Sequence, residues 1–176
     1  MNVTGHRLQS LVREIEACIE GQRRMFEENI QYFEDEKANH VDPLKIGERL
    51  SAMNALLTLV QTQQAAYNLS VTVEVLGKKI SLAQAVKLVG LAGGEEKMWR
   101  EAVSLKRDRY GEMTRKNKDE VLAVRAIPYD IAVRCVRRAA QWVNALRLAI
   151  AQGNTQERPA VYLNEADLKV LDDGGL

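Results

Sequence analysis

The 176-residue sequence has only two cysteines, Cys18 and Cys135, which lie too far apart for a CxxC motif or a disulfide framework. Each falls on the apolar side of an expected helix, so we expect two buried free thiols. The first residues lack the apolar core of a signal peptide, and no run approaches the roughly 18 apolar residues of a membrane span. These absences predict a cytoplasmic protein without a membrane partner.

Signatures of catalysis are also missing. The two histidines, His6 and His40, have no metal-ligand spacing around them. The sequence contains no GxSxG, Walker or Rossmann fingerprint, and it lacks the Glu-x-x-His pairs of ferritin-like di-iron sites. We therefore expect a protein that is not an enzyme and that holds no cofactor and no metal ion.

Charge of either sign is in little excess, because the formal net charge is +1. This balance provides no global attraction to nucleic acid or to a membrane. The distribution is uneven: residues 1–42 hold five Lys/Arg against nine Asp/Glu, whereas residues 121–153 hold five arginines against Asp130 alone. Segments of opposite charge can pair with each other, either within one bundle or between subunits. Otherwise each forms a charged face exposed to solvent.

Helical periodicity is what the sequence has in abundance. Apolar residues spaced three and four apart predict a first helix from about residue 4 to 36, with Thr4 as its N-cap. Asp42 and Pro43 have the character of a cap and a first helical residue, so a second helix is expected to begin there. Helices of this length are typical of bundles, and polar residues on their apolar seams favour a homo-oligomer.

A cluster of glycines divides the middle of the chain. Ser81 and Gln84 form a capping box for a helix over 82–90, and three glycines follow within residues 90–94. Each glycine costs about 0.8–1 kcal/mol in a helix interior relative to alanine. We therefore expect a kink or a short loop there, and a new helix from about residue 95 to 111.

A short β element interrupts the helices. Val71, Val73 and Val75 alternate with polar residues, which predicts a strand near 70–76. The Leu-Gly-Lys-Lys sequence after it is expected to form a turn, and residues 121–127 are the expected second strand of the element. The predicted fold class is therefore mainly α: an oligomeric long-helix bundle with a small inserted antiparallel β element.

The C-terminal part is expected to hold one more long helix and a tail. The helix should cover about residues 129–152, with Cys135 and Trp142 in its core stripe. The bundle domain then covers residues 1–153, and the tail, residues 154–176, either docks or is disordered.

A basic segment that carries aromatic residues lies between the two expected strands. Residues 97–118 hold eight Lys/Arg against three acidic residues. Guanidinium groups bind phosphate in a bidentate manner, and Trp or Tyr stacks on a base. With arginines from the last helix as a second wall, the candidate ligand-binding residues are Lys97, Trp99, Arg100, Arg107, Arg109, Tyr110, Arg125, Arg134 and Arg138. The alternative is that Trp99 anchors the core and the arginines are ion-paired.

From Leu56 onward the order of elements resembles that of the septicolysin-like helical proteins. The shared points are a helix that ends in Tyr67-Asn68, a strand and turn, a helix start at residues 82–85, Asp108-Arg109-Tyr110, a second strand and a last long helix. The N-terminal Gly-Gln-Arg-Arg segment and the glycine cluster do not match. The resemblance implies a helical, oligomerising architecture; the family has no assigned activity and supplies no catalytic residues.

These features favour a non-enzymatic oligomeric binding protein that captures or sequesters a small phosphorylated ligand, with a nucleotide-derived signal as the expected class. Small helical phage proteins that sequester immune signalling nucleotides have the same general profile. This analogy suggests a viral or bacterial protein. The alternative is a structural or protein-interaction helical module without a small-molecule ligand. The expected partners are a second copy of the chain and the small ligand. Nucleic acid is disfavoured because a net charge of +1 and an acidic first helix leave no extended basic surface.

Overall fold

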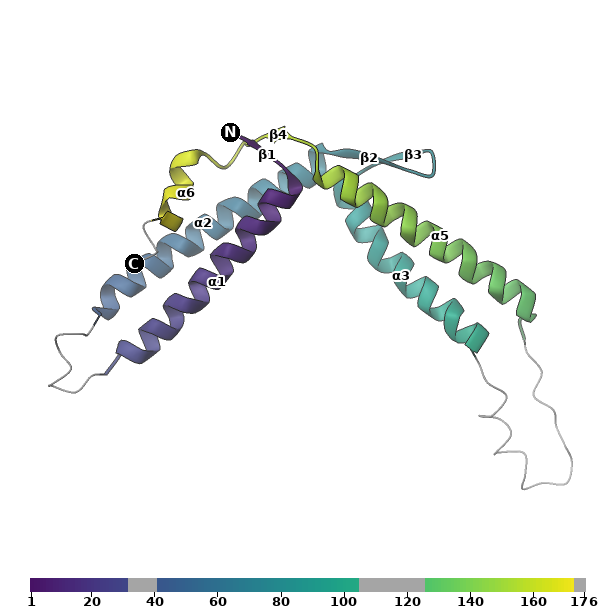
Figure 1. Ribbon diagram of the computed structural model, residues 1–176, viewed down its shortest axis with the longest axis horizontal. Helices are drawn as coiled ribbons and strands as arrows, with labels where there is room; N and C mark the ends of the chain where they lie inside the picture. Colours follow the sequence, from purple (N-terminus) through teal and green to yellow (C-terminus); the bar gives the residue numbers. More distant parts are fainter. Residues whose placement is uncertain (32–40, 105–125, 173–176) are drawn as a thin grey trace, which may run out of the picture. The chain divides into compact units, whose positions relative to one another are not determined.

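The computed structural model describes residues 1–31, 41–104 and 126–172. Over these ranges the chain forms five helices and two small antiparallel sheets of two strands each, so the predicted mainly α fold with a small β element is confirmed (Figure 1). The chain divides into two compact units. The first comprises Met1–Val71 with Gln152–Leu176, and the second comprises Thr72–Ala151. The C-terminal segment therefore belongs to the same unit as the N-terminal helices.

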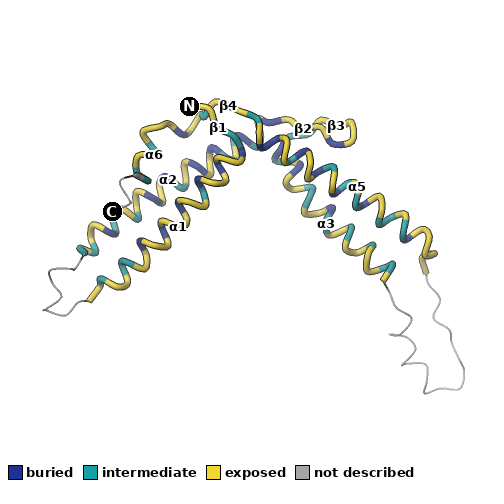
Figure 2. Tube along the Cα trace, in the orientation of Figure 1, coloured by how far each residue is buried: buried dark blue, intermediate teal, exposed yellow. Residues whose placement is uncertain are grey.

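The first unit is built on an antiparallel pair of helices, α1 (Gly5–Asn29) and α2 (Pro43–Ser70). Both predicted N-caps are confirmed: Thr4 Oγ1 accepts from the backbone N–H of Arg7 at 3.2 Å, and Asp42 Oδ1 accepts from that of Leu44 at 2.9 Å. Figure 2 shows the buried residues along the sides where the two helices face each other. They include Leu8, Leu11, Ile15, Ile19, Ile46, Met53, Leu56 and Val60.

Two expectations for α1 were wrong. The helix ends at Asn29, and residues 30 and 31 form a bend, whereas the sequence predicts a helix to about residue 36. The side chain of Asn29 explains the end, since its Nδ2 donates to the carbonyl of Met25 at 2.8 Å and its Oδ1 accepts from Val41 N–H at 3.0 Å. Cys18 is exposed rather than buried, because the buried stripe passes through Ile15 and Ile19 instead.

The C-terminal segment docks on the first unit. Strand β4 (Arg158–Pro159) pairs with β1 (Asn2–Val3), and the helix α6 (Glu165–Asp172) packs on α2. Gln63 of α2, only 1% exposed, holds the intervening residues: its Oε1 accepts from the N–H groups of Val161 and Tyr162 at 2.7 and 2.8 Å. A single buried amide oxygen therefore binds two backbone donors that would otherwise lack a partner.

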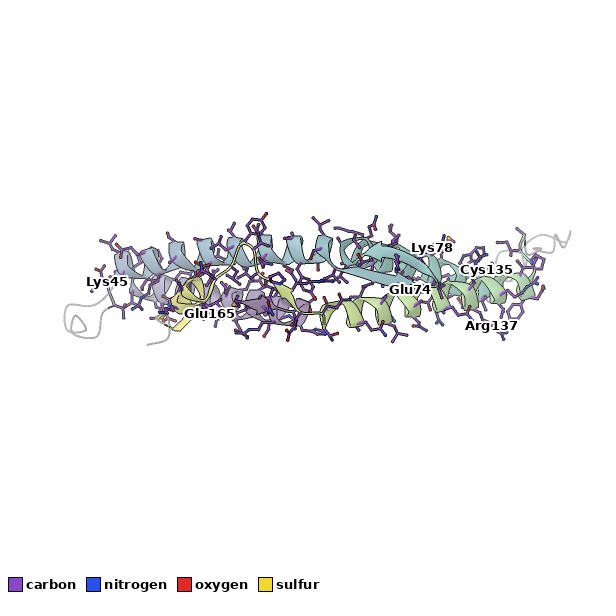
Figure 3. All side chains as sticks on the ribbon, turned by 90° about the horizontal axis from the view of Figure 1, so that it is seen from above. Lys45, Glu74, Lys78, Cys135, Arg137 and Glu165 are labelled. Atoms are coloured by element: carbon purple, nitrogen blue, oxygen red, sulfur yellow. The ribbon has the colours of Figure 1, made fainter. Side chains whose placement is uncertain are left out.

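The second unit begins with a hairpin of β2 (Thr72–Val75) and β3 (Lys78–Ser81), on which Figure 3 labels Glu74 and Lys78. The alternation of β2 is as predicted, with Val73 and Val75 buried. The assignment of Lys78 and Lys79 to a turn was wrong, because Leu76 and Gly77 alone reverse the chain with φ values of +49° and +81°. Two positive φ values suit a two-residue hairpin, so the partner strand follows at once. Of the expected strand at 121–127, residues 121–125 lie outside the described ranges and the last two form a bend.

Two long helices complete the second unit, α3 (Leu82–Ser104) and the part of α5 (Tyr129–Asn154) that precedes residue 152. The predicted capping box is confirmed, since Ser81 Oγ accepts from Gln84 N–H at 3.2 Å and Gln84 Oε1 accepts from Ser81 N–H at 3.0 Å. Within the described ranges, no helix is both long and apolar enough to cross a bilayer.

The break expected at the glycine cluster was wrong, because α3 runs through residues 90–94 without interruption. A β-carbon added at Gly90, Gly93 or Gly94 would meet no atom within 4 Å, so no contact inside the chain requires a glycine there. The helix is anchored instead by the capping box before the cluster, by the buried Ala92 within it and by the half-buried Trp99 after it. Helix-breaking propensity is thus overridden by capping and packing.

Gly93→Ala is expected to raise the free energy of unfolding by about 1 kcal/mol, since alanine removes the entropic cost of glycine in a helix interior. The half-buried site has room for the methyl group. Urea unfolding followed by circular dichroism measures the difference. A loss of stability would show that the chain bends at this position in solution.

Candidate functional site

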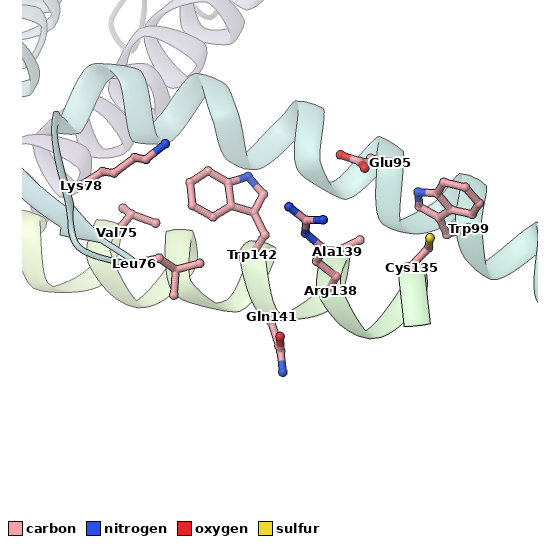
Figure 4. A pocket seen from close by; sticks show the side chains of 10 residues that line it. All are labelled: Val75, Leu76, Lys78, Glu95, Trp99, Cys135, Arg138, Ala139, Gln141 and Trp142. Atoms are coloured by element: carbon pink, nitrogen blue, oxygen red, sulfur yellow. The ribbon is translucent and has the colours of Figure 1, made fainter. Parts of the chain in front are cut away.

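A groove of 760 Å³ lies within the second unit, between α3, α5 and the tip of the hairpin (Figure 4). We call it the α3–α5 groove. Its α5 wall comes from Cys135, Arg138, Ala139, Gln141 and Trp142, and its α3 wall from Glu95 and Trp99. Val75, Leu76 and Lys78 close one end.

Helical spacing explains why these side chains meet. Cys135, Arg138 and Trp142 are three, four and seven residues apart, so they share one face of α5. Ala139 lies on the same face and is buried, and its small side chain leaves space between its larger neighbours. Glu95 and Trp99 are four residues apart on α3. Each wall therefore has one tryptophan with a charged residue one helical turn before it. On α5 these are Trp142 and Arg138, and on α3 they are Trp99 and Glu95.

The charged groups of the lining are two cations and one carboxylate. The guanidinium of Arg138 points from α5 towards α3, between the side chains of Trp142 and Trp99 (Figure 4). Among the residues that the structure describes, neither Arg138 nor Lys78 forms an ion pair, and Glu95 forms none either. The groove therefore keeps two cationic groups available beside two aromatic faces.

The structure brings two of the predicted site residues together, Trp99 and Arg138. Arg100 binds Glu96 instead, with its Nη2 and Nε at 2.6 and 2.8 Å from Glu96 Oε1. Arg134 Nη2 pairs with Asp130 Oδ2 at 3.3 Å. Lys97 is exposed and does not line the groove. The remaining candidates, Arg107, Arg109, Tyr110 and Arg125, lie outside the described residues.

Several lining residues, chiefly Trp142 and Lys78, were not among the residues predicted for the site. Trp142 and Cys135 were expected in the core stripe of the last helix, but both are only half-buried and line the groove, so the expectation of a buried Cys135 was wrong. The available signal was Arg138, a cation one turn from Trp142 on an otherwise apolar stripe. Lys78 was hidden because it was assigned to a turn rather than to β3.

A metal centre has no support in the described ranges, where no three His, Cys, Asp or Glu side chains group closely enough to hold an ion. The groove therefore has to be interpreted through its indoles and cations, which are groups that bind planar and anionic ligands.

Comparison with known proteins adds a fold and no activity. No family model and no curated protein matches the sequence. A similar solved structure is the crystal structure of a functionally unknown conserved protein from Corynebacterium diphtheriae, at a TM-score of 0.63 and 12% identity. The likeness covers 90% of this chain and 100% of that chain. It shows a shared fold.

Proposed function

We propose that this protein is a non-enzymatic, self-associating binding protein that captures a small phosphorylated ligand of the nucleotide class in the α3–α5 groove. The observation that carries the proposal is Arg138, a guanidinium without an ion partner in the described residues, placed between Trp99 and Trp142. The groove volume of 760 Å³ lies within the range of roughly 300–1,000 Å³ that is typical of small-molecule sites.

The chemistry of each side chain in the groove indicates which part of a nucleotide it would contact. An indole stacks on a nucleobase, a contact that contributes about 1–3 kcal/mol per base and tolerates any base. A guanidinium forms charge-assisted hydrogen bonds to phosphate oxygens, and a lysine adds a point charge. Glu95 would repel a phosphate close to it and would accept from the N–H groups of a base. We infer that the phosphates lie towards Arg138 and Lys78, and that the base stacks on an indole.

The alternative, a protein-interaction module, has its own support. Leu76 at the hairpin tip is 69% exposed, and Leu91 and Met98 on α3 are 73% and 54% exposed. Leu76 also lines the groove, so a protein that covered this side chain would lie at the edge of the groove. Under this alternative the groove would receive a partner side chain rather than a nucleotide.

Titration calorimetry with a panel of linear and cyclic nucleotides tests the proposal. At least one member is expected to bind once per chain with measurable heat, because a stacked base contributes about 1–3 kcal/mol and a charge-assisted phosphate contact adds to it. The matching nucleoside and inorganic phosphate are the controls, and each should bind at least tenfold more weakly than the nucleotide. If no nucleotide gives heat or quenches tryptophan fluorescence, the proposal is wrong and the interaction module takes its place.

A further inference from the structure

The outward face of α3 carries a stripe of exposed residues that no described residue of the second unit covers. Its members follow a four-three spacing, which keeps them on one side of the helix. They are Lys87, Leu91, Gly94, Met98 and Glu101, with Gly90 beside them. We call this set the α3 stripe. The buried residues of the same helix, Leu82, Ala85 and Ala92, lie on the other side.

The stripe combines large apolar side chains with bare backbone. Leu91 and Met98 are 73% and 54% exposed, and Gly90 and Gly94 are exposed beside them. A β-carbon at either glycine would meet no atom of the chain itself within 4 Å. Two glycines cost an exposed helix about 2 kcal/mol relative to alanine, and the described chain shows no contact that requires them. Close approach of another backbone is what glycine allows at such a position.

The stripe is also complementary to itself. Lys87 and Glu101 each lie seven residues from Gly94, and Gly90 and Met98 each lie four residues from it. When two copies of α3 cross antiparallel at Gly94, Lys87 of one copy is therefore level with Glu101 of the other, and Met98 is level with Gly90. Two-fold symmetry produces each of these pairings twice. In the part of the chain that the structure describes, neither Lys87 nor Glu101 has an ion partner of its own.

We propose that the α3 stripe is a homodimerisation surface, on which α3 of a second copy of this chain packs antiparallel about Gly94. Charge complementarity favours a second copy as the partner, because Glu101 of each copy would pair with Lys87 of the other. The missing side chain of Gly90 in each copy would leave space for Met98 of the other. Of the groove residues on α3, Trp99 lies away from the stripe, whereas Glu95 borders it, one turn after Leu91. The surface supplies the self-association in the proposed function but rests on observations separate from the groove. The nucleotide titration and the assembly state consequently fail or succeed independently.

A charge-swap experiment on the full chain tests the surface. Sedimentation equilibrium is measured for the wild type, for Lys87→Glu, for Glu101→Lys and for an equimolar mixture of the two variants. The wild type is expected to be at least dimeric, and each single variant should associate about tenfold more weakly, because two attractive contacts become two repulsive ones. The mixture should recover the wild-type association, since a heterodimer of the two variants pairs unlike charges at both contacts.

Three further variants keep the result interpretable. Arg137→Glu reverses an exposed charge on α5, away from the stripe, and should leave the association unchanged. Met98→Asp places a charge on an exposed position and should abolish dimers without a loss of helical circular dichroism. Gly94→Ala should weaken the dimer while it stabilises the separate chain. A monomeric wild type overturns the inference, as does a mixture of the two charge variants that associates no better than either variant alone.

Discussion

Gly5→Ala is expected to lower the free energy of unfolding by about 1–3 kcal/mol, the cost of inserting a methyl group into a packed site. A β-carbon at Gly5 would overlap Oδ1 of Asn154 and lie 2.9 Å from Cε1 of Tyr67. Neither neighbour yields easily. Asn154 is buried, and the hydroxyl of Tyr67 lies 2.7 Å from the carbonyl of Gly153 and 2.8 Å from that of Gln156. Displacing the ring would break the hydrogen bond that the single hydroxyl proton makes to these carbonyls.

Gly21→Ala on the same helix is the matched control. Gly21 is exposed, and a β-carbon there meets no atom within 4 Å. This variant should gain about 1 kcal/mol, because alanine has the higher helix propensity. The two substitutions are chemically identical and are predicted to change stability in opposite directions. Urea unfolding of both proteins checks the pair, and equal effects would contradict the packing of α1 against Tyr67.

Arg138→Ala should weaken binding of the preferred nucleotide by about 10- to 100-fold, the range that corresponds to one lost hydrogen bond to a charged group. Arg137 is the matched control, since it is the adjacent exposed arginine of α5 and does not line the groove. Arg137→Ala should therefore change the Kd less than twofold. The phosphate contact also predicts that added salt weakens binding of the wild type more than that of Arg138→Ala.

Calorimetry on both variants decides the matter. An equal loss of affinity in the two would indicate a general effect of positive charge on α5 rather than a contact within the groove. Retained affinity in Arg138→Ala would place the nucleotide elsewhere. Both variants change exposed side chains, so circular dichroism should show no difference in helix content.

Local chemistry made much of the fold predictable. Thr4, Asp42 with Pro43, and Ser81 with Gln84 each define a helix start through hydrogen bonds to residues at most three positions away. Such signals lie within one short window of sequence. The alternation of β2 is a signal of the same kind, and it is confirmed by the burial of Val73 and Val75.

The errors arose where distant residues decide the structure. Asn29 ends α1 partly through Val41, a residue twelve positions away. The glycine cluster remains helical because the capping box before it and the packing of Ala92 and Trp99 outweigh the propensity of its glycines. Gln63 binds Val161 and Tyr162, almost a hundred residues further along the chain, so its role could not be read from its own helix.

The sequence predicted the kinds of side chain in the candidate site, which are basic and aromatic. It predicted only some of the particular residues that line the groove. Basic and aromatic content pointed to Trp99 and Arg138, which do line one groove. The same reasoning included Arg100 and Arg134, although Glu96 and Asp130 lie four residues before them, a spacing that favours ion pairs on a helix and supports the alternative of ion-paired arginines. Trp142 was assigned to the core since a half-buried and a buried indole have the same helical spacing.

Native mass spectrometry of the protein with a nucleotide mixture is the sharpest test of nucleotide capture, because the mass of the adduct itself identifies which nucleotide is bound. Nucleotide capture in the groove predicts one adduct of nucleotide mass per chain on the wild type and on Arg137→Ala, lost under denaturing conditions and strongly reduced on Arg138→Ala. An absence of any adduct, or an equal adduct on all three proteins, would contradict nucleotide capture in the α3–α5 groove.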